Sequence, residues 1–448
     1  MTLLTPYLDA IKSAALMREV GHVRHVTGLT IESDGPDVGI GALCRIQRKG
    51  GGNQSHAGQD ILAEVVGVGP RGVTLMPYGP CDGLAAGCEV VANGELSRIG
   101  VGEPLLGRII DGFGVPLDGG PPPRTTAFRP LRSAPVNPMR RPRISEVIET
   151  GVRSIDGLLT LGGGQRVGIF AGSGVGKSTL LGMIVRHIRA DVRVIALVGE
   201  RGREVREFVE KHIGPEAMRS TVVVAATSDQ PALARIRATY AALAIAEHFR
   251  DAGRQVLLTM DSVTRFAMAR REVGLAAGEP PTARGYTPSV FAEIPELCER
   301  CGMAESGGSI TALFTVLVDG DDLNEPISDS LRAVLDGHIV LSRQIAHRGQ
   351  YPAIDVLKSA SRIMPDLASA DELTLAQEAI KQLDILERNR QMVDMGAYEK
   401  GSSEVLDHAL ALEPGLQAWL RQREGGVTRE ASLRELAQLL QVQPQERK

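Results

Sequence analysis

The sequence predicts a multidomain protein with an N-terminal β-barrel, a central α/β domain built on a mostly parallel sheet, and a C-terminal helical domain. Three observations support this order. Short β-type runs broken by glycine fill residues 21–99. Strand and helix patterns alternate from about residue 150 to 365, and beyond residue 370 only helical spacing remains. A chain of 448 residues is also too long for a single core.

The N-terminal part divides into a helix and a barrel. Residues 1–20 predict a short amphipathic helix, because apolar residues recur at helical spacing at Leu4, Leu8, Ile11, Ala15 and Leu16. Residues 21–99 carry strand-like runs separated by Gly-Pro turns, which is typical of a small β-barrel. The clearest runs are residues 28–32, 61–66, 72–76 and 89–91.

The central domain is expected over residues 100–370. Its first part, residues 100–150, is rich in proline and glycine and reads as a connector that wraps onto the domain. The remaining residues, 371–448, predict a helical domain. Leucine-rich spacing marks two helices there, one by Leu373, Ala376, Ile380, Leu383 and Leu386, and one by Leu433, Leu436, Leu439 and Leu440.

Composition and charge exclude several classes of protein. Hydrophobic residues make up 43% and charged residues 23% of the chain, as in ordinary globular proteins. The net charge of −4 gives no general attraction to nucleic acid, and 3% aromatic residues disfavour base stacking on single strands. No apolar run is long enough to cross a membrane, and no secretory signal opens the chain. We therefore expect a cytoplasmic protein that does not bind nucleic acid.

The five cysteines include a C-x-x-C pair, Cys298 and Cys301. A zinc or redox site at this spacing normally has a second pair or a histidine cluster, and none accompanies it in the sequence. We predict two reduced thiols on one helix.

A glycine-rich loop closing on Lys-Ser follows the apolar run that ends at Phe170, and this is the sequence form of a phosphate-binding P-loop. Glycines let backbone N–H groups turn toward phosphate oxygens, and the following helix directs its positive end at the same phosphates. Lys177 would reach the β- and γ-phosphates of a nucleoside triphosphate. The predicted nucleotide-binding residues are Ala171, Gly172, Ser173, Gly174, Val175, Gly176, Lys177, Ser178 and Thr179, with alanine in place of the usual first glycine.

A carboxylate follows a second apolar run, Val256–Met260, at Asp261. At the carboxyl end of a strand beside the P-loop, such a carboxylate can hold Mg²⁺ through the water shell of the ion. Ser178 would ligate the same Mg²⁺ directly through its hydroxyl.

A third strand-like run, Ile195–Val198, leads into Gly-Glu-Arg-Gly-Arg-Glu. Glu200 at that strand end could deprotonate the water that attacks the γ-phosphate, and Arg201 could stabilise the charge on the transferred group. By spacing alone, a solvated charged turn remains an equal alternative.

Further segments resemble one protein family. They are, in order, VGERGREV, LLTMDSVTRF, GEPPTARGYTPSVFAEIPELCER, DDLNEPISDSLRAVLDGHIVLSR and YPAIDVLKSASRIM. Over about residues 20–425 they resemble rotary ATP synthase catalytic subunits and, more closely, the ATPases of flagellar and type III protein export. The segment GQRVGIFAGSGVGKSTLL is similar to the export version, which tolerates alanine at the first P-loop position. The resemblance implies a RecA-like ATPase domain that uses ATP and Mg²⁺.

The resemblance also implies roles for the matching residues. Glu200 would be the general base, and Arg201 would contact the γ-phosphate. Asp261 would be the carboxylate linked to Mg²⁺, and Arg265 would lie close to the γ-phosphate.

Two more residues match family positions. Tyr351 falls where the family stacks an aromatic ring on adenine, and flat rings suit a base. Arg362 falls where the family keeps an arginine finger that acts on the neighbouring subunit's site, which implies a homohexameric ring.

Two departures from the ATP synthase β-subunit favour the export family. The acidic loop that contacts the rotating shaft is replaced by Ala397–Glu404, and the chain lacks the aromatic segment that completes the synthase adenine pocket. The export family implies a dimeric stalk-like regulator docked on residues 1–20 and a central stalk-like protein near Ala397–Glu404. It also implies contacts with an export gate and chaperone-bound substrates, and peripheral association with the cytoplasmic face of the inner membrane.

The leading interpretation is therefore the ATP-hydrolysing motor of flagellar protein export. The ATPase of a virulence injectisome and a rotary or V-type catalytic subunit are the alternatives with the same site chemistry. A hexameric RNA translocase would need a basic barrel with RNA-binding aromatics, which residues 22–99 do not carry. A non-catalytic ring subunit would lack the base, and Glu200 is present.

Overall fold

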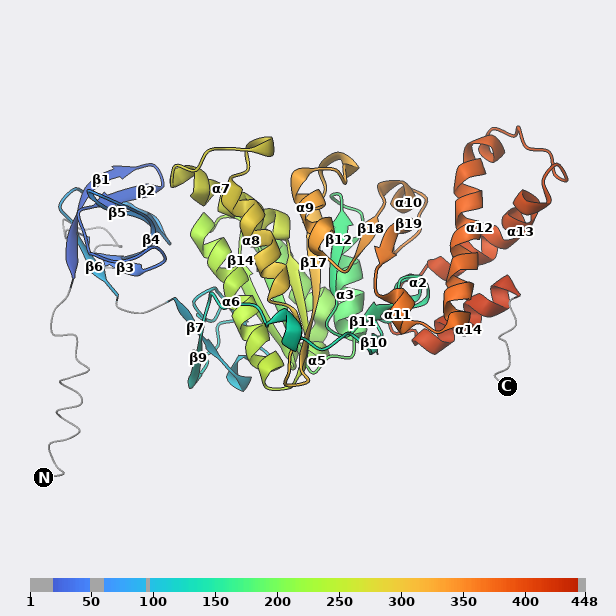
Figure 1. The fold of residues 1–448 in the computed structure, drawn as a ribbon, viewed down its shortest axis with the longest axis horizontal. Coiled ribbons are helices and arrows are strands. Elements are labelled where there is room, and N and C mark those ends of the chain that lie inside the picture. The colour runs from blue at the N-terminus through green and yellow to red at the C-terminus, as the bar shows by residue number, and fades with distance from the viewer. Residues whose placement is uncertain (1–18, 49–59, 94–96, 442–448) are drawn as a thin grey trace, which may run out of the picture.

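The computed structural model describes residues 19–48, 60–93 and 97–441 and arranges them as three parts along one long axis (Figure 1). A barrel lies at one end, an α/β domain in the middle and a helical part at the other end, so the predicted fold class is confirmed. The helix expected over residues 1–20 falls mostly outside the described residues, and Val20 belongs to the first barrel strand instead. In the described part of the chain, no helix has the length and apolarity needed to cross a membrane.

Six strands close the barrel in the order β1-β2-β5-β4-β3-β6. They are β1 (Val20–Thr27), β2 (Thr30–Ser33), β3 (Leu43–Ile46), β4 (Ile61–Gly69), β5 (Gly72–Pro77) and β6 (Glu89–Ala92). Side chains alternate between the interior and the outside of a barrel. Ile61, Ala63 and Val65 of β4 are buried accordingly, while Leu62 and Glu64 between them are partly exposed.

The connector is more structured than its composition suggests. Strand β7 (Arg98–Val101) pairs with β9 (Ala127–Pro130), so residues 98–99 of the expected barrel range pair outside the barrel. The two-residue strand β8 (Ile109–Ile110) joins the edge of the central sheet beside β14. Such a short apolar pair carries no readable period in sequence, which is why the connector reads as a loop.

The central sheet has nine strands, in the order β19-β18-β12-β17-β15-β13-β14-β8, with β16 paired to β17. Its interior pairings from β18 to β8 are parallel, while β19 and β16 pair antiparallel. The further strands are β12 (Arg166–Ala171), β13 (Val192–Val198), β14 (Thr221–Ala226), β15 (Gln255–Asp261), β16 (Gly302–Met303), β17 (Ser309–Leu317), β18 (Gly337–Leu341) and β19 (Ile354–Ser361), with a separate pair, β10 (Val147–Ile148) and β11 (Leu161–Gly162).

Helices cover both faces of this sheet (Figure 1). The helices of the central domain are α2 (Arg153–Leu158), α3 (Lys177–His187), α4 (Gly202–Glu207), α5 (Gly214–Met218), α6 (Ala232–Asp251), α7 (Val263–Ala276), α8 (Pro288–Glu299), α9 (Pro326–Val334), α10 (Arg343–His347) and α11 (Met364–Leu367). Short helical turns are η1 (Glu103–Leu105), η2 (Pro138–Arg140), η3 (Phe208–Ile213), η4 (Ala283–Gly285) and η5 (Asp319–Asp321).

Two hydrophobic cores sandwich the sheet, because alternate residues of each strand point to opposite faces. Val194 and Ala196 of β13 join the core under α6, α7 and α8. Ile195 and Leu197 of the same strand join the core that includes α3 and the C-terminal helices. The sheet is therefore buried on both faces, as the sequence predicts for parallel strands.

The C-terminal part consists of α12 (Ala370–Asp394), α13 (Glu404–Leu420) and α14 (Arg429–Leu440). A capping box formed by Ser369 and Glu372 begins α12. The sequence pattern marks α12 and α14 but not α13, which contains Pro414 and so breaks the usual helix signal. The thiols of Cys298 and Cys301 are both buried and free, and Cys301 lies beyond the end of α8 rather than on one helix with Cys298.

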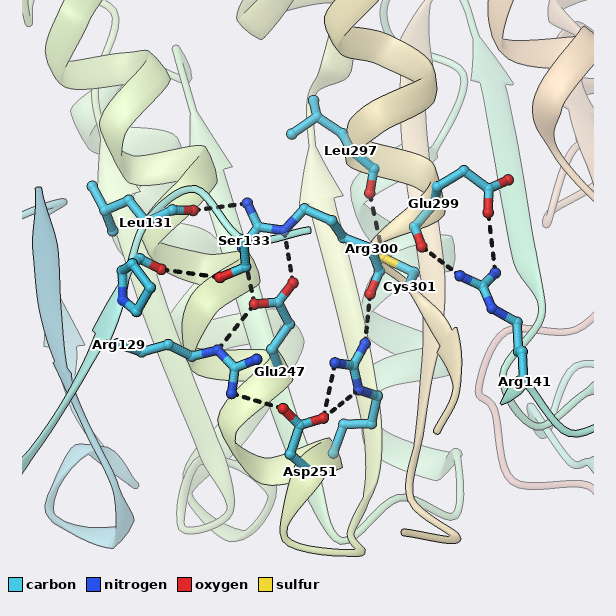
Figure 2. Close-up of polar contacts among 12 residues, drawn as sticks. Arg129, Leu131, Ser133, Arg141, Glu247, Asp251, Leu297, Glu299, Arg300 and Cys301 are labelled. Carbon is cyan, nitrogen blue, oxygen red and sulfur yellow. Dashed lines mark hydrogen bonds and ion pairs between the residues drawn. The ribbon is translucent and has the colours of Figure 1, made fainter. Parts of the chain in front are cut away.

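A buried ion pair holds the connector against the central domain (Figure 2). Arg300 Nε lies 2.7 Å from Glu247 Oε1, with side chains 0% and 1% exposed. Arg129 of β9 contacts the same carboxylate at 3.1 Å, and Arg300 Nη1 donates to the carbonyl of Leu131 at 2.7 Å. The chain before the P-loop is therefore fixed to α6 and α8 by charge-assisted hydrogen bonds.

Replacing Glu247 with leucine should lower the free energy of unfolding by about 3–5 kcal/mol, because it leaves the Arg300 guanidinium charged and buried. Urea denaturation followed by circular dichroism measures this loss. Glu210→Ala is the control: it removes the exposed Arg206–Glu210 pair and should cost less than about 1 kcal/mol. Equal losses in the two variants would show that the buried pair does not stabilise the domain.

Candidate active site

Three parallel strands of the central sheet, β12, β15 and β13, bring the predicted residues to one edge of the sheet. Strand β12 ends at Ala171 before the P-loop, β15 ends at Asp261, and Glu200 follows β13 by two residues. Strands β12, β17, β15 and β13 are adjacent and parallel, so their carboxyl ends meet at the same edge. This is where open parallel sheets bind ligands.

The P-loop has the backbone that the motif requires. Gly174 and Gly176 have φ of 77° and 94°, a left-handed conformation that favours glycine. Gly176 is the N-cap of α3, and Lys177 and Ser178 are the first residues of that helix. The loop therefore leads directly into a helix N-terminus, where orphan N–H groups bind phosphate.

The ammonium of Lys177 lies between two carboxylates. Its Nζ is 2.5 Å from Asp261 Oδ1 and 3.5 Å from Glu200 Oε1. Burial disfavours the charge on Lys177, but the two carboxylates outweigh burial and raise the pKa of the lysine. Lys177 is therefore held charged at the base of the P-loop.

Thr315 helps to hold the carboxylate of Asp261, and no motif in the sequence predicts this role. Its Oγ1 donates to Asp261 Oδ1 at 2.7 Å from the neighbouring strand β17. The one available signal is a hydroxyl inside the apolar run of β17, SITALFTVL. Asp261 thus has two partners that fix its carboxylate.

Glu200 has the ionisation of a candidate base. Burial and the nearby charge of Asp261 raise the pKa of Glu200 to about 7, against the opposing effect of Lys177. A carboxylate that titrates near neutral pH can hold and release a proton under working conditions. The Glu200 side chain is also only 15% exposed and lies 3.5 Å from Lys177 Nζ, unlike the side chains of a solvated charged turn.

The residues present fit a Mg²⁺ ion. Ser178, Glu200 and Asp261 line one cavity of about 80 Å³. A hydroxyl and a carboxylate are oxygen ligands of the type that Mg²⁺ takes together with water and phosphate. Ser178 and Asp261, which the sequence predicts as its ligands, are therefore brought to one place.

Tyr351 lies at the opening of the P-loop. A side-chain carbon built on Gly176 would stand 3.3 Å from the Tyr351 ring, and the tyrosine is 45% exposed. An exposed aromatic face beside a phosphate-binding loop offers a stacking surface for a nucleotide base.

The two arginines near Glu200 differ in placement. Arg265 in α7 packs against Gly199, where an added side-chain carbon would stand 2.8 Å from Arg265 Cβ. The side chain of Arg201 is 69% exposed and pairs with Glu204 at 3.7 Å. The structure therefore brings Arg265 next to the Glu200 segment and leaves Arg201 facing solvent.

Arg362 lies apart from this cluster. It follows β19 at the edge of the sheet, is exposed, and donates from Nη2 to the carbonyl of Arg332 at 3.0 Å. Its backbone N–H donates to the carbonyl of Asp336 at 2.9 Å. Arg362 is thus presented at a surface on the side of β18 and β19.

Family models match most of the described chain. The "ATP synthase alpha/beta family, beta-barrel domain" matches residues 23–94, and the "ATP synthase alpha/beta family, nucleotide-binding domain" matches residues 151–361. The "T3SS EscN ATPase C-terminal domain" matches residues 368–438.

Relatives extend over nearly the whole chain. It is 52% identical over 415 residues to the "Flagellum-specific ATP synthase" of Bacillus subtilis (strain 168), covering 93% of each. It is 47% identical to the protein of the same description from Salmonella typhimurium, covering 94% of this chain and 95% of that one. The assembled ATPase EscN from the enteropathogenic E. coli type III secretion system is 42% identical with a TM-score of 0.87, covering 94% of this chain and all of the solved chain.

Glu200→Gln should stabilise the protein at about pH 8 and have little effect at about pH 5. The folded carboxyl has a pKa of about 7, against an ordinary value of 4.5, so it holds its proton more tightly than the unfolded chain does. Stability is therefore lost as pH rises through this window, and the neutral amide avoids the loss, on the order of 2–3 kcal/mol. Denaturant midpoints at the two pH values measure the gain, and an equal gain at both would contradict the raised pKa.

Proposed function

Because the chain belongs to the family of flagellum-specific ATP synthases and type III secretion system ATPases, we propose that it drives flagellar protein export by ATP hydrolysis. The family makes the chain an ATPase. The observation that carries the catalytic proposal is Lys177 held between Asp261 and Glu200 at the end of the P-loop.

The chain's own residues account for binding and hydrolysis. Backbone N–H groups of residues 172–178 bind the phosphates, and Lys177 moves from its carboxylate partners to the β- and γ-phosphates. Glu200 accepts the proton of the attacking water, because its raised pKa suits a general base. Mg²⁺, held by Ser178 and through water by Asp261, would neutralise charge on the phosphates. Arg265, packed on Gly199, is proposed to lie near the γ-phosphate.

Arg362 is proposed to act on a neighbouring subunit. It is exposed at the edge of the sheet, away from the Lys177 cluster of its own chain. A homohexameric ring would place it against the next subunit's γ-phosphate, and the similar EscN chain is described as an assembled ATPase. Arg201 is proposed to contact the γ-phosphate as well. Its side chain is exposed beside Glu204, so it would have to turn inward when the nucleotide binds.

Further partners follow from the same family. The segment Ala397–Glu404 covers most of the loop between α12 and α13 and the first residue of α13, and Met395 and Val405 near its ends are 68% and 58% exposed. EscN has also been solved in complex with its central stalk EscO, which supports a central stalk-like partner. We propose this loop as the contact for such a partner. We also propose a dimeric regulator on residues 1–20, an export gate and chaperone-bound cargo as partners, and a cytoplasmic location at the inner membrane.

The flagellar system is favoured over its alternatives by the relatives. Flagellum-specific proteins from Bacillus subtilis and Treponema pallidum are 52% and 50% identical to the chain, against 45% for a Xanthomonas euvesicatoria type 3 secretion system ATPase. The match of residues 368–438 to the T3SS EscN ATPase C-terminal domain favours export over a rotary synthase role.

Lys177→Ala should abolish export in the cell that encodes this chain. The substitution removes a charge-assisted contact to the phosphates, and circular dichroism of the purified variant checks that the fold is retained. Filament protein secreted into the medium is the measurement, and Glu210→Ala, on the exposed α4–η3 surface, is the matched control. Secretion at the wild-type level from the Lys177→Ala strain would refute the export motor.

Mixing two inactive variants should restore activity if the site is shared between subunits. Glu200→Gln should lower the turnover rate about 10²–10⁴-fold. Arg362→Ala removes the proposed arginine finger, a group that raises the rate of phosphoryl transfer roughly 10³–10⁵-fold. In a mixed ring, some sites combine an intact Glu200 with a neighbour's intact Arg362. Recovered ATPase activity on mixing supports the trans site, and no recovery despite proven mixed rings contradicts it.

A further inference from the structure

We propose that Gln422 is a positioning residue for the nucleotide base, because it fixes Tyr351 at the opening of the P-loop. Gln422 lies in the segment between α13 and α14, far in sequence from the P-loop. The inference rests on the proposed function, in which Tyr351 stacks on adenine, and it assigns to the helical domain a part in holding the base.

Gln422 is a buried polar residue whose backbone N–H, side-chain Nε2 and side-chain Oε1 each have a hydrogen-bond partner. It is 7% exposed. Its backbone N–H donates to the carbonyl of Tyr351 at 2.8 Å, and its side-chain Nε2 donates to the carbonyl of Gly151 at 2.8 Å. Its Oε1 accepts from the N–H of Arg153 at 2.9 Å. One residue of the helical domain thus joins the Tyr351 loop to the start of α2.

The surrounding contacts make this junction tight. A side-chain carbon on Gly151 would stand 2.7 Å from the nitrogen of Gly426 and 2.8 Å from His187 Cβ. Gly426 N–H also donates to the carbonyl of Gly151 at 3.0 Å. His187 is the last residue of α3, the helix that begins at Lys177. The chain from Gln422 to Gly426 therefore contacts both the Tyr351 loop and the C-terminal end of α3, the helix that follows the P-loop.

Tyr351 needs such support because its own ring is only half covered. It stands in the turn between α10 and β19, and its ring reaches Gly176 while remaining 45% exposed. An exposed ring is a good stacking surface only if its backbone is held, since ordering it on binding costs entropy. The backbone N–H of Gln422 holds the carbonyl of Tyr351 from the helical domain. The side chain of Gln422 in turn holds its own backbone in place through its hydrogen bonds to Gly151 and Arg153.

The chain carries a built-in reporter of this contact. Trp419 is the single tryptophan of the sequence and lies near the end of α13, three residues before Gln422. It is 5% exposed, packs against Gly157 of α2, and donates from Nε1 to the carbonyl of Ser432. A base that engages Tyr351 should therefore change Trp419 emission through Gln422.

The test compares a ligand that has a base with one that does not. MgATP and Mg-tripolyphosphate both engage the P-loop, but only MgATP reaches Tyr351. We expect Gln422→Met, which keeps the side-chain shape and removes both of its hydrogen bonds, to weaken MgATP binding about 3- to 10-fold in calorimetry. Tripolyphosphate binding should stay within about 2-fold of wild type, which shows that the fold and P-loop are intact.

Trp419 fluorescence gives a second, independent measurement. In the wild type, MgATP should shift the emission and tripolyphosphate should not, and Gln422→Met should reduce the MgATP shift. Gln417→Met is the matched control, because the Gln417 amide donates from Nε2 to Glu413 Oε1 at 2.7 Å, one turn earlier in α13. It should leave both ligand affinities and the fluorescence shift unchanged.

Two results would overturn the inference: unchanged MgATP affinity in Gln422→Met, or equal weakening of MgATP and tripolyphosphate, which indicates general destabilisation. Tyr351→Ala separates these from failure of the proposed function. It should remove the advantage of MgATP over tripolyphosphate, and if that advantage persists the base does not lie on Tyr351. A wild-type chain that binds neither ligand would refute the nucleotide site itself.

Discussion

The site depends on the charge of one buried lysine. An isolated ammonium is costly to bury, and Lys177 is stable in this position because Asp261 and Glu200 offset its charge at 2.5 and 3.5 Å. The same arrangement affects the carboxylates: Asp261 is satisfied by Lys177 and Thr315, while burial and the charge of Asp261 raise the pKa of Glu200 to about 7. The same three side chains thus supply both a candidate phosphate-binding group, Lys177, and a candidate base, Glu200.

This compensation requires strands from distant parts of the sequence to be adjacent. The order β12-β17-β15-β13 places the P-loop, Asp261 and Glu200 at one edge, and two hydrophobic cores keep the sheet rigid from both faces. The buried Arg300–Glu247 pair fixes the connector before β12 to α6 and α8 (Figure 2). On the other side, Gln422 joins the helical domain to Gly151 and Tyr351. The edge of the sheet that carries the P-loop is thereby linked both to the connector and to the helical domain.

Local patterns in the sequence predict the parts whose chemistry is local. The P-loop, the acid at the end of β15 and the alternation of strand and helix are visible there, because each is a short motif or a regular period. Thr315 and Gln422 are not visible, since their roles come from partners that only the fold brings near. Helix α13 is hidden by Pro414, and β8 is too short to show a period. The spacing of residues in the sequence does not decide whether Glu200 is a base or part of a solvated turn. The burial of Glu200 beside Asp261 favours the role of a base.

The central claim is that a carboxyl titrating near neutral pH takes the proton from the attacking water. Its most direct test is the pH dependence of kcat/KM for MgATP, which reports ionisations of the free enzyme. Glu200 acts only when ionised, so kcat/KM should fall as pH decreases through about 7. The residual activity of Glu200→Gln should lack that inflection. A wild-type profile that is flat from about pH 5.5 to about pH 9, or that bends only near the ordinary glutamate value, would contradict the claim.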